Sequence, residues 1–234
     1  MRILITGASG AIGWATVKRL AEDGHELVLH THQRKTELEQ LVKQLPVTTE
    51  IVTGDLSDRS ALAAFCETLP SVEGFIHIAG TSFSGLLVDQ TVRSAEAMLT
   101  LHVESLIQIA QVLTRKKAFS APLSIVVVSS VLGETGVAGE VVYSTCKAAQ
   151  LGFVKSYSKE LGAMHGRVNA VTPGWIDTPM NAVFSEEDRE LALAEIPAGR
   201  FGRVEEVASA IVYLMSRESE YMNGAVLKID GAWM

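Results

Sequence analysis

The chain has 234 residues, of which 47% are hydrophobic and 20% are charged, so it can bury the core of one globular domain. Its 20 Lys and Arg residues and 27 Asp and Glu residues give a net charge of -7. No Lys/Arg run is long enough to break this acidic balance, so neither nucleic acid nor a membrane surface is expected as a partner. The first residues pass directly into an apolar strand without a long hydrophobic leader, which predicts a cytoplasmic protein.

The cysteines and histidines predict neither a disulfide framework nor a metal site. Cys66 and Cys146 are far apart, and the chain has no Cys-x-x-Cys pair for zinc, so we expect two packed thiols. His30 and His32 alternate at the end of a predicted strand, as two metal ligands can. The sequence places no third ligand with them, so no metal is predicted.

Short apolar runs rich in Val and Ile alternate with longer segments of helical period along the chain. Continuous apolar runs are typical of strands that are buried on both faces. The predicted strands are Ile3–Thr6, Glu26–Leu29, Thr49–Thr53, Gly74–Ala79, Leu123–Ser129, Arg167–Thr172 and Ala225–Ile229. The predicted helices between them include Ala11–Asp23, Asp58–Leu69 behind Ser57 as its N-cap, and Tyr143–Leu161.

This alternation predicts an α/β fold: one Rossmann-type, doubly wound parallel sheet of about seven strands with helices on both faces. Prolines stand singly at the borders of elements, and no linker rich in Pro, Gly or Ser divides the chain. We therefore predict a single dinucleotide-binding catalytic domain over residues 1–234.

A glycine-rich turn joins the first predicted strand to the first predicted helix. Its sequence is Thr6-Gly7-Ala8-Ser9-Gly10-Ala11-Ile12-Gly13. Small residues at this junction let backbone N–H groups and the helix N-terminus approach a pyrophosphate. A merely tight turn is the alternative, but the position at the first strand-to-helix junction of an alternating chain favours a dinucleotide.

The end of the second predicted strand bears on which dinucleotide binds. The segment from His30 to Lys35 has no Asp or Glu to hold the ribose 2′-hydroxyl of NAD. His32, Arg34 and Lys35 suit the 2′-phosphate of NADP instead. The alternative is that Arg34 and Lys35 only solvate the first turn of a surface helix. We predict NADPH or NADP, with NAD less favoured.

Tyr143 and Lys147 stand four residues apart on a predicted helix, so their side chains share one face. An ammonium beside the phenol predicts a lowered pKa of Tyr143, which suits a general acid or base for a ketone or an alcohol. Ser129 and Ser130 end a predicted strand, at the edge where open α/β sheets bind ligands. The alternative is that the Tyr-x-x-x-Lys spacing only reflects the polar face of an ordinary amphipathic helix.

In order and spacing these motifs resemble the short-chain dehydrogenase/reductase family, and most closely its 3-oxoacyl-acyl-carrier-protein reductases. The resemblance covers nearly the whole chain and includes Ser130 at 13 residues before Tyr143 and the stretch from Ile196 to Ala208. It implies catalytic roles for Ser130, Tyr143 and Lys147. It implies cofactor contacts from Gly7, Ser9, Gly10, Ala11, Ile12, Gly13, His32, Arg34, Lys35, Asp55, Leu56, Ala79, Gly80, Tyr143, Lys147, Pro173, Gly174, Ile176 and Thr178.

The chain departs from the family pattern at several positions. Ala11 replaces a usual glycine, and its methyl group should narrow the approach of the pyrophosphate without forbidding it. His77 and Ile78 replace two amides that help stabilise the central strand. Imidazole can substitute for one of them, whereas the Ile78 side chain cannot hydrogen-bond.

His102 stands where the family places a catalytic Asn, which holds a water in the proton relay to Lys147. A neutral histidine has one donor and one acceptor, so it can hold such a water or carry protons itself and link Lys147 to solvent. The alternative is a packed histidine at a slower site.

The resemblance implies NADPH-dependent reduction of a ketone to a secondary alcohol. A 3-oxoacyl thioester on acyl carrier protein, as in fatty acid or polyketide synthesis, is the first candidate substrate, and small free ketones are the alternative. A rival hypothesis is a nucleotide-binding protein of the same fold that has lost turnover and acts as a partner subunit or sensor. The altered positions motivate this rival, and the retained Ser130, Tyr143 and Lys147 argue against it.

Three further segments bear on partners and substrate. An acidic carrier protein needs local cations, and the candidates are Arg93, Arg115, Lys116 and Lys117, which surface solvation also explains. The segment Asn181–Glu195 is where family members build substrate walls, and its run from Ser185 to Asp188 predicts a helix start. The resemblance places Trp233 and Met234 near a subunit interface, which implies a homodimer or homotetramer. A C-terminus buried within one chain is the alternative.

Overall fold

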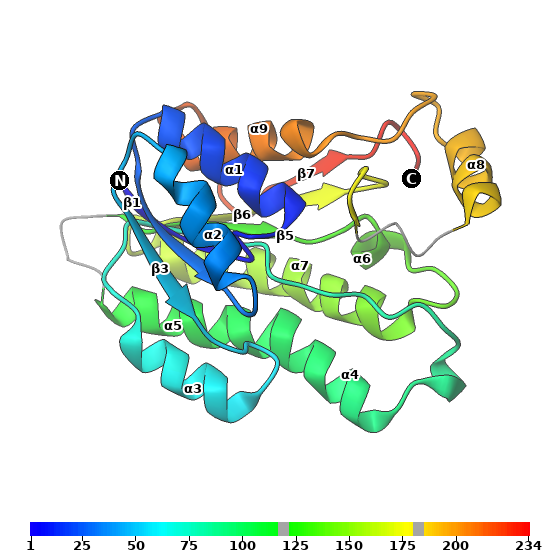
Figure 1. Ribbon diagram of the computed structural model, residues 1–234, viewed down its shortest axis with the longest axis horizontal. Coiled ribbons are helices and arrows are strands. Elements are labelled where there is room, and N and C mark those ends of the chain that lie inside the picture. Colours follow the sequence, from blue (N-terminus) through cyan, green and yellow to red (C-terminus); the bar gives the residue numbers. More distant parts are fainter. Residues whose placement is uncertain (117–121, 180–184) are drawn as a thin grey trace.

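The structure is a computed structural model that describes residues 1–116, 122–179 and 185–234. Strands and helices alternate along the chain, as Figure 1 shows. The strands are β1 (Arg2–Thr6), β2 (Glu26–Thr31), β3 (Thr49–Thr53), β4 (Gly74–His77), β5 (Ser124–Val128), β6 (Arg167–Pro173) and β7 (Val226–Ile229). The helices are α1 (Ala11–Glu22), α2 (Lys35–Leu41), α3 (Arg59–Thr68), α4 (Val92–Leu99), α5 (Ser105–Lys116), α6 (Leu132–Thr135), α7 (Val141–Gly162), α8 (Glu186–Glu195) and α9 (Val204–Met215). A π-helical turn, Thr100–Glu104, joins α4 to α5.

The seven predicted strands are confirmed, with ends that differ from the prediction by at most two residues. They form one parallel sheet in the order β3-β2-β1-β4-β5-β6-β7. The order reverses between β1 and β4, and such a reversal opens a crevice at the carboxyl ends of the strands. These ends point toward the side of Figure 1 that carries α8.

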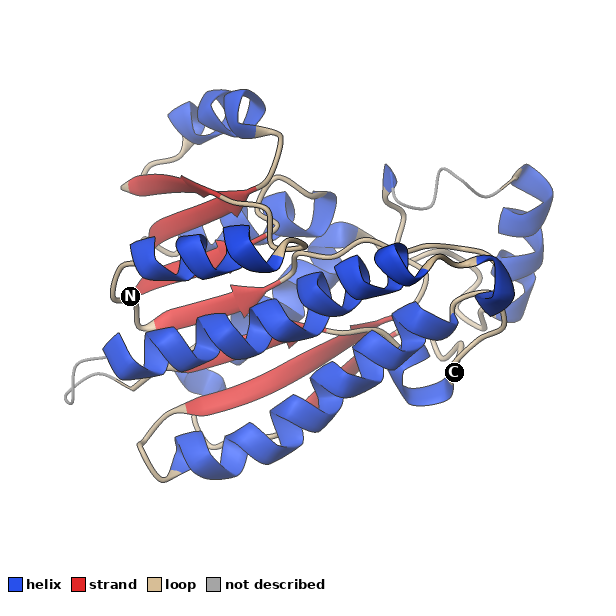
Figure 2. Ribbon diagram, turned by 90° about the horizontal axis from the view of Figure 1, so that it is seen from below, coloured by secondary structure: helices blue, strands red, loops and turns tan. Residues whose placement is uncertain are grey.

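Alternation along each strand divides the core into two layers. On β1, Leu4 packs with α3, α5 and α7 on one face, whereas Ile3 and Ile5 pack with α1, α2 and α9 on the other. On β5, Val126 and Val128 likewise face the second layer. Figure 2 shows helices layered on the sheet and running roughly along the strands. Burial on both faces explains why the strands are continuously apolar in sequence.

The structure tests two predictions about where helices begin, those for α3 and α8. Helix α3 is capped by Asp58, whose carboxylate accepts a hydrogen bond from the Ala61 N–H at 2.8 Å. The prediction of Ser57 as the cap was wrong, because Ser57 donates its hydroxyl and its N–H to Asp55 instead. Ser185 caps α8 in a capping box with Asp188, as predicted.

Candidate active site

The glycine turn packs too tightly for side chains at two of its positions. Gly7 has φ of +71°, and a Cβ there would lie 2.8 Å from the Ala79 nitrogen. A Cβ at Gly13 would lie 2.1 Å from the Gly7 oxygen. Helix α1 begins at Ala11, and the first N–H groups of any helix have no acceptor within the helix. Gly10, the N-cap, has no side chain that could accept from them, so they can bind a ligand. This cradle fits the pyrophosphate of a dinucleotide.

His30 holds the glycine turn in place from β2. Its ring is buried, its Nδ1 accepts from the Gly7 N–H at 3.4 Å, and its Nε2 donates to the Gly54 carbonyl at 3.0 Å. Burial lowers the pKa of His30 to about 4, so the ring is neutral at pH 7. Both ring nitrogens therefore bond the backbone, a role that the sequence did not indicate.

The cationic residues after β2 lie beside this cradle on the surface. Arg34 pairs with Glu37 at 3.5 Å and Lys35 pairs with Glu39 at 3.8 Å, within one turn of α2. Such exposed pairs are weak, so both cations stay available to a phosphate. His32 lies 3.7 Å from Asp55, whereas Leu56 is buried in the core. Any contact of Leu56 with a ligand is therefore through its backbone.

The three predicted catalytic side chains meet at the carboxyl end of β5. Ser130 follows β5, and its hydroxyl lies near enough to the Tyr143 phenol, in the first turn of α7, to favour a lower pKa of that phenol. One helical turn later, Lys147 places its Nζ 5.4 Å from the centre of the Tyr143 ring. The same Nζ donates to the Val128 carbonyl at 2.9 Å. A hydroxyl, a phenol and an ammonium thus face one point at the ligand-binding edge of the sheet.

The predicted lowering of the Tyr143 pKa is wrong for this chain without a ligand. Burial raises the pKa of Tyr143, and the nearby Glu140 carboxylate raises it further, which outweighs the hydrogen bond from Ser130. Burial also lowers the pKa of Lys147 to about 7, which weakens the cation that the prediction relied on. At neutral pH the phenol keeps its proton, and a protonated phenol is the form that donates to a ketone.

Comparison with known proteins agrees with this geometry. A family model described as enoyl-(acyl carrier protein) reductase matches residues 7–233. An uncharacterized oxidoreductase, YmfI of Bacillus subtilis, is 36% identical, over 98% of this chain and 97% of that protein. The 3-oxoacyl-[acyl-carrier-protein] reductase FabG of Thermotoga maritima is 37% identical, over 97% of this chain and 95% of that protein. The chain belongs to the short-chain dehydrogenase/reductase family.

Solved structures of this family share the fold of the chain. A short-chain dehydrogenase/reductase from Serratia marcescens superposes with a TM-score of 0.90 at 26% identity, over 99% of this chain and 97% of that one. BdcA in complex with NADPH superposes with a TM-score of 0.89 at 25% identity, over 99% and 93%. The chain is thus an oxidoreductase of a family whose members include NADPH-binding proteins and carrier-protein reductases.

His102, which the resemblance places at the position of the family's Asn, is a fully buried ring. Its Nε2 donates to the Thr81 carbonyl at 2.8 Å, and its Nδ1 has no hydrogen-bond partner among the described residues. Burial lowers the pKa of His102 to about 3. The ring stands edge-on to Tyr143 at 5.6 Å between centroids, and a Cβ at Gly80 would lie 2.5 Å from it. This geometry favours the packed-histidine alternative over a link to solvent.

Gln150 is a buried residue of the site that sequence reasoning missed. Its Oε1 accepts from the Lys147 ammonium at 3.3 Å, and its Nε2 donates to the His102 carbonyl at 2.9 Å. The available signal was its place three residues after Lys147, on the same helical face. A glutamine in a helix is usually exposed, so the residue type alone does not indicate that Gln150 is buried in the site.

His77, which the resemblance places at one of the family's amide positions, bridges two strands of the sheet. Its Nδ1 bonds the Thr6 hydroxyl of β1 at 3.1 Å, and that hydroxyl accepts from the Ile78 N–H at 3.2 Å. The imidazole therefore makes a buried hydrogen bond at this position, and its equivalence to the family's amide stays a prediction. It ties β4 to β1 next to the glycine turn.

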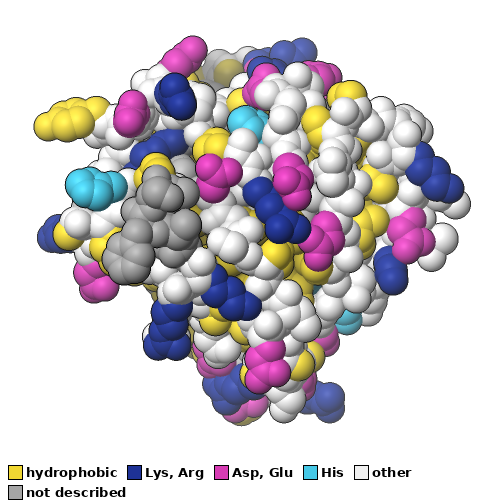
Figure 3. Space-filling model, turned by 90° about the vertical axis from the view of Figure 1, so that its left-hand side faces the viewer, with side chains coloured by type: hydrophobic (Ala, Val, Ile, Leu, Met, Phe, Trp, Pro, Cys, Tyr) yellow, Lys and Arg dark blue, Asp and Glu magenta, His cyan; other side chains and the backbone are white. Residues whose placement is uncertain are grey.

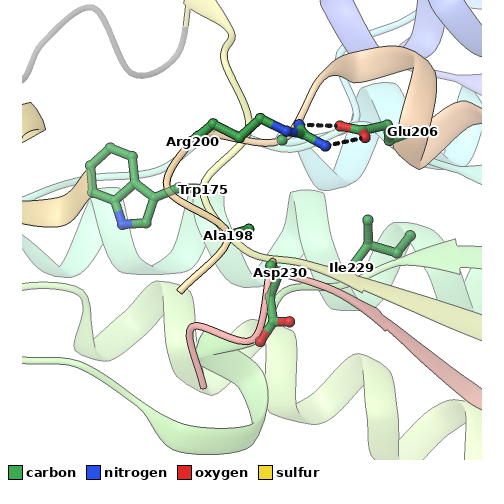
Figure 4. Close-up of a pocket in the computed structure, with 8 residues that line it drawn as sticks. Trp175, Ala198, Arg200, Glu206, Ile229 and Asp230 are labelled. Carbon is green, nitrogen blue, oxygen red and sulfur yellow. Dashed lines mark hydrogen bonds and ion pairs between the residues drawn. The ribbon is translucent and has the colours of Figure 1, made fainter. Parts of the chain in front are cut away.

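The segment Pro173–Thr178 leaves β6 beside the reaction site. Ile176 pairs with Gly202 in a parallel bridge and is buried, while the Gly174 N–H donates to the Ile229 carbonyl at 2.9 Å. Behind this segment lies a cavity of about 110 Å³, shown in Figure 4, where Arg200 makes two hydrogen bonds to Glu206 at 2.9 and 2.7 Å. Gly202 and Arg200 belong to the stretch from Ile196 to Ala208 that resembles the reductase group. This stretch therefore supports the segment Pro173–Thr178, which is expected to contact the nicotinamide.

Proposed function

We propose that this enzyme reduces a ketone to a secondary alcohol with NADPH. The observation that carries the proposal is the meeting of Ser130, Tyr143 and Lys147 at the end of β5, on the sheet edge that also carries the glycine turn. When bound, NADPH supplies the hydride. The proposed domain is the whole chain, residues 1–234, which the family match nearly spans.

Each of the three side chains has one task in this proposal. The Ser130 hydroxyl donates a hydrogen bond to the carbonyl oxygen of the ketone and orients it. Tyr143, protonated at neutral pH, donates its proton to that oxygen as negative charge develops. The Lys147 ammonium stabilises the phenolate that remains and hydrogen-bonds the ribose of the cofactor.

The proposed preference for NADPH over NADH rests on Arg34 and Lys35, and on similarity to a structure that holds NADPH. Removing both cations with Arg34→Ala and Lys35→Ala should raise the Kd for NADPH more than tenfold and leave the Kd for NADH unchanged. Fluorescence titration measures both constants. Equal losses for the two cofactors would show that the cations only support the fold of α2.

For the substrate we propose a 3-oxoacyl thioester on acyl carrier protein, as in fatty acid synthesis, because FabG is among the relatives of this chain. The predicted basic cluster is not one patch. Arg93 begins α4, near the ligand-binding edge, whereas Arg115 and Lys116 end α5 at the opposite end of the molecule (Figure 1). Lys117 lies outside the described residues.

Among the described residues, the end of the molecule that carries Arg115 shows no concentrated positive surface. Figure 3 looks on that end and shows Lys and Arg interspersed with Asp and Glu. Lys116 is occupied there, since its Nζ donates to the Leu69 carbonyl at 2.6 Å. Arg93→Glu should therefore lower kcat/KM about tenfold for the carrier-bound substrate and not for the same acyl group on a short thiol. Arg115→Glu is the matched control.

The first experiment follows the loss of NADPH absorbance with a 3-oxoacyl thioester and, in parallel, with small free ketones. Wild type should turn over, and Tyr143→Phe should lose at least a hundredfold in kcat. Cofactor binding without turnover on every ketone would favour the rival, a protein that has lost catalysis and serves as a partner subunit or sensor. His102→Asn tests the altered position. A higher kcat in this variant would show that His102 slows the reaction, and a lower kcat would show that His102 contributes to catalysis.

We also propose that copies of this chain associate in the cytoplasm as a dimer or tetramer. The continuous helical run Val92–Lys116 is apolar and long enough to cross a membrane, but its inner face packs on the sheet. Its outer face exposes Val92, Leu99 and Ile107, which a second copy can cover. Trp233 packs within its own chain, 6.2 Å from Trp175. Sedimentation should show that Ile107→Glu dissociates the assembly, while Leu191→Glu on α8 does not.

A further inference from the structure

Gln150 joins two parts of the site that lie on different helices. Its side chain is fully buried in α7, between Lys147 on the same helix and the π-helical turn before α5. The ammonium can only donate and the His102 carbonyl can only accept, so the amide has one orientation that satisfies both. The bridge measures 3.3 Å on the lysine side and 2.9 Å on the carbonyl side.

The carbonyl that accepts from this amide belongs to the π-helical turn. In an α-helix each carbonyl accepts from the N–H four residues later, and a π turn shifts that pattern by one residue. The turn Thr100–Glu104 contains His102, and its carbonyl accepts from Gln150. One residue earlier, the Leu101 carbonyl accepts from the Ser105 hydroxyl. Side chains thus supply donors where the regular helical ladder changes.

The surroundings of Lys147 show what its charge depends on. The ionisable groups that face it are Tyr143 and Cys146 on α7, His102 on the π-helical turn and His77 on β4. Burial raises the pKa of Tyr143 and raises that of Cys146 to about 11, and it lowers the pKa of both histidines. All four are therefore neutral at pH 7. The ammonium is held by two neutral oxygens, those of Val128 and Gln150.

We propose that Gln150 is a positioning residue, whose amide oxygen keeps the Lys147 ammonium charged beside Tyr143 and whose amide nitrogen anchors it to the π-helical turn. This inference rests on the proposed function for the use that catalysis makes of Lys147. The hydrogen bonds themselves do not depend on that use. Because an amide has no proton to give up near neutral pH, Gln150 holds the charge and does not relay protons.

The test is the titration of Lys147 in the cofactor-free protein, followed by NMR of labelled lysine and assigned with Lys147→Met. Gln150→Met removes the acceptor at similar length and should lower the pKa of Lys147 by about one unit, since a hydrogen bond to a charged group is lost. Gln150→Glu places an anion there and should raise the pKa by about one unit or more. Gln111→Met, at an exposed position of α5, should leave it unchanged.

The pH dependence of kcat/KM is a second measurement, and it should shift in opposite directions in the two variants. Loss of the ammonium at high pH should lower kcat/KM, and that fall should move to lower pH in Gln150→Met and to higher pH in Gln150→Glu. A Lys147 titration that stays in place in both variants, or in Gln150→Glu alone if Gln150→Met fails to fold, overturns the proposal. A shifted titration without turnover on any ketone leaves Gln150 as proposed and refutes the reductase function instead.

Discussion

Two adjacent serines at the end of β5 have different partners. The Ser129 hydroxyl donates to the Lys147 backbone carbonyl at 2.9 Å and so fastens α7 to the sheet. The Ser130 hydroxyl accepts from the Leu132 N–H at 3.2 Å and acts to lower the pKa of the nearby Tyr143 phenol. A Cβ at Gly133 would lie 2.7 Å from the Lys147 carbonyl carbon, so α6 also packs directly on this part of α7. One serine therefore sets the position of the helix, and the other serves the reaction.

This difference predicts opposite losses in two alanine variants. Ser130→Ala should lower kcat/KM for a ketone by about a hundredfold with little change in stability, because a donor to the reacting oxygen is removed. Ser129→Ala should cost about 1 kcal/mol of unfolding free energy and keep most of the activity, because it removes one buried hydrogen bond. Urea unfolding and NADPH consumption measure the two effects. Equal rate losses in both variants would contradict the separate roles.

At the scale of elements, close packing of the glycine turn on α1 creates the cofactor cradle. The Trp14 N–H donates to the Gly10 carbonyl at 2.8 Å and starts the helix, while Gly7 and Gly13 touch almost directly. Ala11, which stands where the family usually has glycine, is half-buried at the first helical position. The methyl group that departs from the family is therefore accommodated without breaking the turn.

Gly13→Ala should destabilise the protein and weaken the binding of NADPH. The added Cβ would sit 2.1 Å from the Gly7 oxygen, so the turn must move, and overpacking of this kind costs about 1–3 kcal/mol. Gly152→Ala is the matched control, because a Cβ at that exposed position of α7 meets nothing within 4 Å. Because alanine is favoured over glycine in a helix interior, Gly152→Ala should raise the unfolding free energy by about 0.5–1 kcal/mol. Urea unfolding and cofactor titration compare the variants, and unchanged cofactor binding in Gly13→Ala would argue against the cradle.

Across the whole molecule, three buried histidines tie distant segments together near the sheet's carboxyl edge. His30 joins the glycine turn to the end of β3, His77 joins β4 to β1, and His102 joins the π-helical turn to Thr81. Burial lowers the pKa of each ring. Folding therefore requires three neutral imidazoles, and this makes the stability of the whole chain depend on pH.

Acid should unfold the protein by protonating these rings. Below pH 6.5 the unfolded chain binds protons that the folded imidazoles do not, so their contribution to stability is complete above pH 6.5 and is lost as pH falls toward 4. For His30 the loss between pH 7 and pH 5 should be about 2 kcal/mol. His30→Gln keeps a donor and an acceptor without titrating, so it should lose correspondingly less over that range. Urea unfolding at both pH values tests this, and identical acid losses would contradict it.

The sequence by itself determined the number of strands and their order along the chain, the glycine turn, and the shared helical face of Tyr143 and Lys147. These features depend on local periodicity and on short spacings, which a folded neighbourhood does not change. The family comparison confirmed the fold and the reductase resemblance. That His77 would hydrogen-bond within the sheet was also predictable, because hydrogen-bonding capacity belongs to the side chain itself.

Only the tertiary structure decided how the site residues are charged and what holds them. The pKa of Tyr143 rises because the fold removes much of its side chain from water, and Asp58 caps α3 because its backbone adopts the extended conformation of an N-cap. Gln150 meets His102, 48 residues earlier in the chain, through a π-helical turn that no local pattern revealed. Burial and contacts between distant segments arise from the packing of the whole chain, so they follow from three-dimensional proximity and not from sequence spacing.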